Sequence, residues 1–361
     1  AAARLDETEQ FPTEILKKAF ELGLLNICIP AEYGGAGLSH FEQTFLAEEL
    51  SAGCVGVTTS IVANDLGNLP ILIGGSEEQK MRLLKPFTEK MKLGCFCLTE
   101  PGAGSDVASM STTATKEGDE YVLNGTKCFI TNGGVAEQYT VFATMDKAKG
   151  HKAITCFVVE GRPKGLEVAK KEHKMGQRCS DTVMLHFDGV RVPAKNRIGA
   201  EGEGFKIAMT TLDQSRPLTA IFAVGIARAA MEHALTYAKE RKQFGKMIAE
   251  FQGIQFMLAD MATDIEAARL LCWKAAWLLD AGQRNTLVSS YAKRFSADMA
   301  MRVTTDAVQI FGGNGYMKDY PVEKLMRDAK LIQIYEGTSQ IQRMVIARDI
   351  YGGASPSGGL V

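Results

Sequence analysis

The stretch Tyr121-Val122-Leu123-Asn124-Gly125-Thr126-Lys127-Cys128-Phe129-Ile130 has the short alternating period of strands, whereas the chain on either side of it has a helical period. Asn-Gly is a strong tight-turn dipeptide, so we expect a hairpin that turns at Asn124-Gly125. Further strands are expected at 141–144, 154–159 and 183–187, separated by Gly, Pro and charged turns. This part of the chain therefore predicts a small β-domain, compatible with a barrel or a sandwich.

Helical patterns flank the β-rich segment on both sides. Apolar residues recur at three- and four-residue intervals from Phe11 to about Glu89, and again from Gly204 onward. In the second of these segments, helices are predicted over Ala220 to Arg241, Phe251 to Ala281, Thr286 to Phe311 and Ile341 to Ile350. Long helices joined by short loops predict an antiparallel four-helix bundle. We therefore predict an α+β fold, mostly α, made of an N-terminal helical domain over 1–91, a middle β-barrel-like domain over 92–199 and a C-terminal four-helix bundle over 200–361.

Composition narrows the class of function. The chain has 361 residues and a net charge of -1 with interspersed signs, so it offers no basic face for nucleic acid. We expect no membrane span, because no apolar run approaches the roughly 20 residues that a spanning helix needs. The 8 cysteines are scattered without a CxxC pair and the 5 histidines lie far apart, which predicts buried free thiols in a reducing compartment and no metal site.

The stretch Gln333-Ile334-Tyr335-Glu336-Gly337-Thr338-Ser339-Gln340 places one carboxylate between an aromatic ring and a glycine. Apolar walls disfavour the charged form of Glu336 and raise its pKa toward the range in which a general base works. Gly337 leaves the backbone accessible to a substrate, and an amide there can bind a carbonyl oxygen. The ordinary alternative is an acidic residue at a helix start, where the dipole favours it.

Two glycine-containing segments in the β-region suit a flat ligand. The segment 96–106 joins a buried strand to a glycine-rich loop that carries the hydroxyls of Thr99 and Ser105, but no βαβ unit surrounds it. Phe129 stands two residues before Thr131, and an aromatic ring beside a hydroxyl suits a planar heterocycle such as a flavin. The alternatives are a structural turn and a core phenylalanine.

Three segments of the C-terminal half carry polar groups beside predicted helices. The segment 212–217 is expected to precede the first bundle helix, where Arg216 either holds an acidic partner, orders the loop around a thioester substrate or forms a surface ion pair. The segment 240–246 is a cationic cluster that could clamp a pyrophosphate or simply complement a helix dipole. The segment 309–313 offers an amide side chain followed by a glycine pair.

Five of these blocks, taken in order, resemble the acyl-CoA dehydrogenase family, closest to its medium- and short-chain members. The resemblance runs from about Phe11 to Arg348 and rests on the segments 98–102, 129–134, 241–245, 309–313 and 335–338. It implies an FAD-dependent dehydrogenation of a saturated short- or medium-chain acyl-CoA to the trans-2-enoyl-CoA, as in fatty-acid β-oxidation. Glu336 would remove the α-proton while the β-hydride passes to flavin N5.

The resemblance also implies a setting for this reaction. The assembly would be a homotetramer made of two dimers, and electron-transferring flavoprotein would accept the electrons. The enzyme would be soluble, in the mitochondrial matrix or the bacterial cytoplasm. Relative to the family, the first N-terminal helices are expected to be missing from the start of this chain.

Individual site residues are implied by the same resemblance. The positions that match FAD contacts are Phe96, Leu98, Thr99, Ser105, Phe129, Thr131, Arg241, Gln243, Phe244, Gln252, Gln309, Gly313, Thr338 and Gln340. Among these, the residues from Arg241 to Gly313 match positions that reach the FAD of a neighbouring subunit. The positions that match contacts around the acyl-CoA are Ser105, Asp213, Ser215, Arg216, Tyr335, Gly337 and Arg348. The thioester carbonyl would be bound by the Glu336 amide and a flavin ribityl hydroxyl.

Two alternatives concern the substrate and the activity itself. Asp65 lies in a segment that lines the acyl pocket in relatives, and we expect it to be a helix-surface group. It could instead be a second base for a cyclic or branched acyl-CoA. A catalytically silent flavoprotein on the same scaffold is disfavoured by the presence of Glu336. Long-chain and isovaleryl-type members of the family carry their base on the helix near Ser215. That position has no carboxylate here, so the resemblance favours the straight-chain branch of the family.

Overall fold

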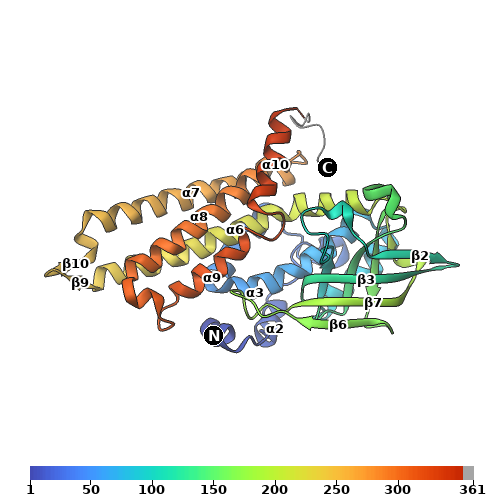
Figure 1. Ribbon diagram of the computed structural model, residues 1–361, viewed down its shortest axis with the longest axis horizontal. Coiled ribbons are helices and arrows are strands. Elements are labelled where there is room, and N and C mark those ends of the chain that lie inside the picture. The colour runs from blue at the N-terminus through green and yellow to red at the C-terminus, as the bar shows by residue number, and fades with distance from the viewer. Residues whose placement is uncertain (353–361) are drawn as a thin grey trace.

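The computed structural model describes residues 1–352, with long helices at one end and a sheet at the other (Figure 1). The helices are α1 (Ala2–Thr8), α2 (Thr13–Glu21), α3 (His40–Gly74), α4 (Glu77–Leu84), α5 (Pro86–Glu89), α6 (Gly204–Glu240), α7 (Gln252–Asp280), α8 (Thr286–Phe311), α9 (Val322–Ile332) and α10 (Ser339–Ile350). The strands are β1 (Gly94–Cys97), β2 (Thr113–Glu117), β3 (Glu120–Thr131), β4 (Gln138–Thr144), β5 (Ile154–Glu160), β6 (Leu166–Lys171), β7 (Thr182–Pro193), β8 (Arg197–Ile198), β9 (Lys242–Gln243) and β10 (Lys246–Met247). The expected order of helical, β and helical regions is confirmed.

The sheet has the strand order β6-β7-β3-β2-β4-β5-β8, and β1 pairs in parallel with β4. The expected hairpin at Asn124-Gly125 is wrong, because both residues lie inside the single strand β3. The chain turns instead between Glu117 and Glu120, which are paired at the end of β2 and β3. Gly125 has φ +150°, and a Cβ there would come within 2.5 Å of the Thr112 hydroxyl. The glycine therefore serves a strand irregularity and a close approach rather than a turn.

The C-terminal helices differ from expectation mainly at their starts. Helix α6 begins at Gly204 rather than at Ala220, so the segment 212–217 lies inside the helix and does not precede it. Pro217 is accommodated in the helix interior. The predicted helix from Thr286 to Phe311 is confirmed as α8, whereas α9 was not predicted.

The long helices pack side by side, and α3 joins them from the N-terminal region. Helix α6 packs against α3, α7 and α8, and α10 packs on α8 (Figure 1). Helices α3 and α6 are long and apolar enough to cross a membrane by length and composition, so the expectation that no segment approaches this length was wrong. Their most apolar windows are 67% and 72% buried inside the protein, which accounts for the composition as that of core helices. The 8 cysteines are free, as expected, and all except Cys28 are buried.

Candidate active site

Glu336 lies in the short loop that connects α9 to α10. Glu336 and Gly337 both have left-handed backbone conformations, with φ +51° and +85°. A non-glycine residue in this region is uncommon and persists only when its surroundings hold it there. At the end of the loop, the Thr338 hydroxyl accepts a hydrogen bond from the Ile341 amide at 3.1 Å and so caps α10. The backbone around the carboxylate is therefore fixed at a defined angle.

The Glu336 carboxylate faces the first half of α6. Its Oε2 atom accepts a hydrogen bond from the Ser215 hydroxyl at 2.6 Å, and Thr219 lies one turn further along the helix. Burial raises the pKa of Glu336, although the hydroxyls of Ser215 and Thr219 and the charges of Arg216 and Lys293 act in the opposite direction. A carboxylate with a raised pKa at a prepared position is suited to take a proton from carbon.

Two buried side chains, those of Lys293 and Gln342, donate hydrogen bonds to the backbone of this loop. The Lys293 ammonium on α8 donates a hydrogen bond to the Gly337 carbonyl oxygen at 2.7 Å. The Gln342 amide donates to the Glu336 and Gly337 carbonyl oxygens at 3.3 and 3.2 Å. Burial lowers the pKa of Lys293 to about 7, and the Glu336 charge opposes this shift. Sequence reasoning missed both residues. The available signal for Lys293 was a lysine on the buried face of the helix formed by residues 286–311, whose other buried residues are uncharged.

Arg216 is an internal cation of α6 rather than a group beside the helix start. It is only 6% exposed and forms an ion pair with Asp213, one turn earlier. The Asp213 carboxylate also accepts a hydrogen bond from the Thr286 hydroxyl at 2.8 Å, and Asn285 donates to the Asp213 backbone oxygen at 2.9 Å. The proposed reading of Arg216 as a surface ion pair is therefore wrong, while its pairing with an acidic partner is confirmed.

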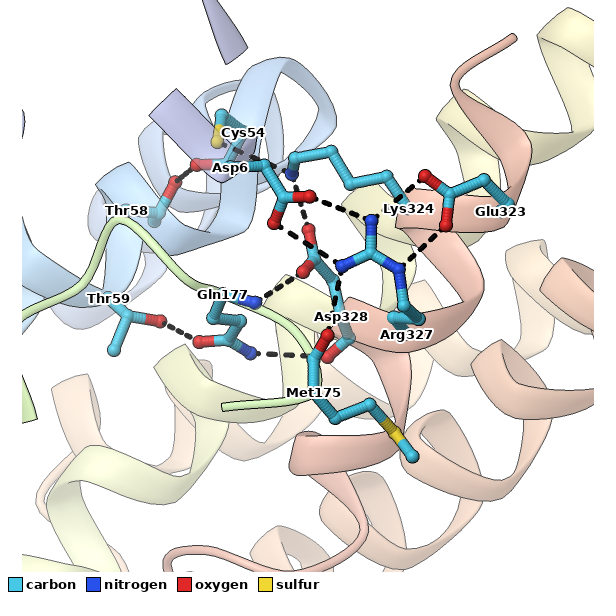
Figure 2. Close-up of polar contacts among 10 residues, drawn as sticks. All are labelled: Asp6, Cys54, Thr58, Thr59, Met175, Gln177, Glu323, Lys324, Arg327 and Asp328. Atoms are coloured by element: carbon cyan, nitrogen blue, oxygen red, sulfur yellow. Dashed lines mark hydrogen bonds and ion pairs between the residues drawn. The ribbon is translucent and has the colours of Figure 1, made fainter. Parts of the chain in front are cut away.

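Helix α9, which leads into the Glu336 loop, is anchored by a buried polar network (Figure 2). Lys324 and Asp328 of α9 form an ion pair at 2.5 Å, and Asp328 also accepts from the Gln177 amide. The Gln177 side chain bonds to Thr59 of α3 at 2.7 Å. Tyr335 lies beside Thr59 and Gln177, and burial raises its pKa. The network therefore ties the start of the loop to α3 and to the segment before β7.

The β-region presents an aromatic ring and an open glycine loop toward the outside. Phe129 has φ +56° at an irregularity of β3, and its side chain is 66% exposed. The Cys128 amide donates to the Thr99 carbonyl oxygen at 2.9 Å, which places Thr99 beside this strand. A Cβ added to Gly102 or Gly104 would meet no atom within 4 Å. These residues fit a planar cofactor that lies along the strand, because no other part of the described chain covers the Phe129 ring or packs against the two glycines.

A buried ion pair stabilises the strand and the loop that carry these residues. Lys127 and Glu100 form an ion pair at 2.8 Å with both side chains almost fully buried. The Glu100 carboxylate also accepts hydrogen bonds from Ser111 and Thr112. The remaining predicted contacts in this part differ in exposure: Leu98 is buried, Phe96 and Thr131 are half-buried, and Ser105 is exposed.

A second group of predicted cofactor residues lies at the opposite end of the helices. Arg241, Gln243 and Phe244 surround the β9–β10 turn, which Figure 1 shows at the tip farthest from the sheet. Phe244 is 93% exposed at φ +51°. The end of α8 is joined to this region, because Asn314 donates to the Tyr237 hydroxyl at 2.7 Å. The predicted residues that are exposed there are Arg241, Gln243, Phe244, Gln252, Gln309 and Gly313.

One chain therefore brings together only part of the predicted site. Ser215, Arg216 and Gly337 gather around Glu336, whereas the group at the far tip stands apart from them. Gln340 and Arg348 are exposed on α10, and nothing in the structure joins them to the Glu336 carboxylate.

Asp65 is not a helix-surface group, so that expectation is wrong. It is 2% exposed within α3, and its Oδ1 atom accepts a hydrogen bond from the Cys28 amide at 3.1 Å. Its second oxygen, Oδ2, is buried without a hydrogen-bond partner in the described part of the chain. Burial raises the pKa of Asp65 to about 6. The expectation failed because other parts of the chain cover this part of α3 on all sides, so no face of the helix is exposed to solvent there.

Comparisons with known proteins agree along the whole chain. Models of the N-terminal, middle and C-terminal domains of acyl-CoA dehydrogenases match residues 1–90, 95–190 and 202–351. A short-chain-specific acyl-CoA dehydrogenase of Clostridium acetobutylicum is 48% identical over 97% of this chain and 93% of its own length. The cyclohexane-1-carbonyl-CoA dehydrogenase of Geobacter metallireducens is 47% identical over 97% of this chain and 92% of its own. The structure of butyryl-CoA dehydrogenase from Megasphaera elsdenii aligns with a TM-score of 0.94 at 46% identity, covering 97% of this chain and 92% of that one.

Proposed function

Because this chain belongs to the acyl-CoA dehydrogenase family, an FAD-dependent family of oxidoreductases, we propose that it dehydrogenates a saturated straight-chain acyl-CoA of short or medium length. The product is the trans-2-enoyl-CoA, as in fatty-acid β-oxidation. The observation that carries the proposal is the Glu336 carboxylate, which burial makes more basic and which Ser215 holds at 2.6 Å. The short-chain-specific relative and the butyryl-CoA dehydrogenase structure support a short chain.

Glu336 acts as the general base that takes the α-proton of the thioester. An α-proton is weakly acidic, so the developing enolate needs hydrogen-bond donors at the carbonyl oxygen, and the backbone amide of Glu336 would be one of them. The acyl chain excludes water from the carboxylate and raises its pKa further. FAD, when bound, supplies the acceptor for the β-hydride. Phe129, Thr131 and Thr99 would hold its ring system against the β-region.

A second copy of the chain completes the cofactor site. The exposed residues at the β9–β10 tip lie far from Glu336 in one chain, so they serve a neighbouring subunit's FAD. This arrangement needs a second chain, and the resemblance to the family extends it to a homotetramer built as a dimer of dimers. Electron-transferring flavoprotein accepts the electrons, and the enzyme works in the bacterial cytoplasm or the mitochondrial matrix.

A cyclic acyl-CoA is the second candidate substrate. Asp65 is buried with one free carboxylate oxygen, and its pKa is raised to about 6. The relative named cyclohexane-1-carbonyl-CoA dehydrogenase is 47% identical to this chain. With such a substrate, Asp65 would act as a second base.

Anaerobic bleaching of the flavin absorbance by a panel of butyryl-, octanoyl-, palmitoyl- and cyclohexanoyl-CoA tests the proposal. We expect a straight-chain thioester to bleach the wild-type protein and to leave Glu336→Gln oxidised. Asp65→Asn is the matched variant, because it removes the carboxylate that would serve as the second base. Bleaching by the cyclic thioester alone, abolished in Asp65→Asn, would favour the second candidate. A flavin-loaded protein that no thioester bleaches would contradict both and favour a silent flavoprotein.

A further inference from the structure

Lys293 and Lys92 are the two buried lysines of residues 1–352 that have no carboxylate within ion-pair distance, and Lys293 is the more deeply buried of them. Its side chain is fully buried, yet no carboxylate in residues 1–352 lies within ion-pair distance of its ammonium. Two other buried lysines show the ordinary arrangement, since Lys127 is paired with Glu100 at 2.8 Å and Lys324 with Asp328 at 2.5 Å. A buried charge without a paired carboxylate is costly, so its hydrogen bond to the Gly337 carbonyl at 2.7 Å calls for an explanation.

The two carbonyl oxygens at the centre of the loop depend on side chains for their hydrogen bonds. Glu336 and Gly337 are consecutive left-handed residues, and their two carbonyl oxygens receive donors only from Lys293 and Gln342 among the described residues. Because a peptide unit is planar, holding a carbonyl in place also fixes the amide on its other side. Lys293 and Gln342 therefore fix the peptide units between Glu336 and Thr338, the first of which adjoins the Cα atom that carries the Glu336 side chain.

The charge of Lys293 acts on the same carboxylate. The charged groups that face Glu336 are Arg216 from α6 and Lys293 from α8, and both favour its ionised form. Arg216 is already paired with Asp213, and the Asp298 carboxylate near Lys293 is bonded to Gln333, Ser339 and Arg343. Lys293 is the cation of this group that no carboxylate neutralises directly.

We propose that Lys293 is a positioning residue for the general base: its ammonium holds the Gly337 carbonyl so that the Glu336 carboxylate stays against Ser215, and its charge keeps that carboxylate ionised in a closed site. The electrostatic effect on Glu336 is measured through catalysis and so rests on the proposed dehydrogenation. The role of Lys293 in holding the loop does not.

Two variants separate the two roles. Lys293→Met keeps the size of the side chain and removes both the hydrogen bond and the charge, whereas Lys293→Gln removes the charge and keeps an amide donor. Lys92→Met is the matched control, because Lys92 is also buried and bonds only to the Gln138 side chain, at 3.2 Å, in the β-region. All three are compared as the purified holoprotein.

Hydrogen exchange of the backbone amides in the segment 333–342 reports loop position without any reaction. We expect faster exchange there in Lys293→Met, and near wild-type exchange in Lys293→Gln and Lys92→Met. Flavin bleaching by butyryl-CoA should be roughly a hundredfold slower in Lys293→Met, because small misplacements of a reacting group cost about this much. In both Lys293 variants, the acid limb of the bleaching rate should move to higher pH, because removing a nearby cation raises the pKa of Glu336.

The outcomes that overturn the proposal are definite. Wild-type exchange in the loop of Lys293→Met contradicts the positioning role, and an unchanged acid limb in both variants contradicts the electrostatic role. If Lys293→Met does not fold, Lys293→Gln still tests the charge through the acid limb, and an unchanged limb overturns it. If no thioester bleaches even the wild type, the proposed function fails, while loop exchange still decides whether Lys293 positions Gly337.

Discussion

The two ends of the helical bundle are built on opposite principles. Around Glu336, the donors come from the same chain: Ser215 from α6, Lys293 from α8 and Gln342 from α10. At the β9–β10 tip, Phe244 is 93% exposed, and the Gln243 side chain bonds only to the adjacent Lys242 carbonyl. The contrast teaches that the hydrogen-bond partners of Glu336 come from one chain, whereas the exposed residues of the tip have the role that we propose for them only against a second chain.

Mixed subunits test this contrast most strongly. Glu336→Gln should reduce flavin bleaching by roughly 10² to 10⁴, the usual range for a general base. The double variant Arg241→Ala/Phe244→Ala should lose bound FAD. Neither parent is active, but a mixed dimer pairs an intact base from one chain with an intact tip from the other. Co-expression in equal amounts should therefore restore about a quarter of the wild-type sites, given a two-fold interface.

Rate and FAD content of the separated hybrid measure this outcome. Mixing two preparations of the same variant provides the control, since it creates no intact site. A hybrid that stays as inactive as its parents would mean that the tip does not reach the neighbour's cofactor.

The anchoring of the Glu336 end by α9 can be broken separately. Asp328→Asn leaves the buried Lys324 ammonium without its carboxylate, which should cost about 3–5 kcal/mol of the free energy of unfolding. Glu14→Gln removes an exposed ion pair with Lys17 and should change stability by less than about 0.5 kcal/mol. Urea unfolding followed by far-UV circular dichroism compares the two. Equal midpoints for both variants would show that the network in Figure 2 does not anchor α9.

Asp65 gives a pH-dependent prediction within the same helical region. Its folded pKa, about 6, lies above the ordinary 3.8, so the folded state is penalised once the unfolded carboxyl ionises. The penalty is absent below pH 3.8, grows toward pH 6 and is complete above it. Asp65→Asn should therefore stabilise the protein at neutral pH by up to about 3 kcal/mol, the free-energy equivalent of that shift.

Thermal unfolding of Asp65→Asn and wild type at pH 4 and pH 7.5 checks this sign. The difference in melting temperature should be close to zero at the lower pH. A difference that is the same at both values would mean that lost packing or the Cys28 hydrogen bond, rather than the charge, decides the effect.

The sequence predicted elements best where one physical signal was present. Helix α8 matched its predicted range because its apolar residues keep a helical period from end to end. The turn predicted at Gly125 was wrong because a glycine permits both a turn and an irregularity within a strand. The close approach of Thr112, which explains the glycine, is visible only in the structure. The start of α6 was placed too late because Asp213, Arg216 and Pro217 interrupt its apolar pattern. The sequence does not show that Asp213 and Arg216 pair within the helix or that Thr286 bonds to Asp213.

Some residues of the candidate site were suggested by the sequence, and others were not. The flanking aromatic ring and glycine made Glu336 a candidate base, but they also fit an ordinary helix start, and the other segments of the family resemblance were needed to favour the base. Lys293 and Gln342 were not, because their importance comes from two carbonyl oxygens of a loop that lies 44 and 5 residues away along the chain. A lysine on the buried face of a helix becomes informative only when its contact is known.

The smallest expected effect separates side-chain support from backbone support at the Glu336 end. Ser215→Ala removes the hydrogen bond of 2.6 Å to the Glu336 carboxylate, which favours the ionised form, so the pKa of Glu336 should rise further. The acid limb of flavin bleaching should move to higher pH, with less than about a tenfold loss of rate on the alkaline side of that limb. Backbone exchange in the segment 333–342 should stay at the wild-type level, because Ser215 touches the carboxylate and not the loop carbonyls. Faster exchange in Ser215→Ala would mean that the carboxylate itself holds the loop, and the separate backbone role of Lys293 and Gln342 would then be unnecessary.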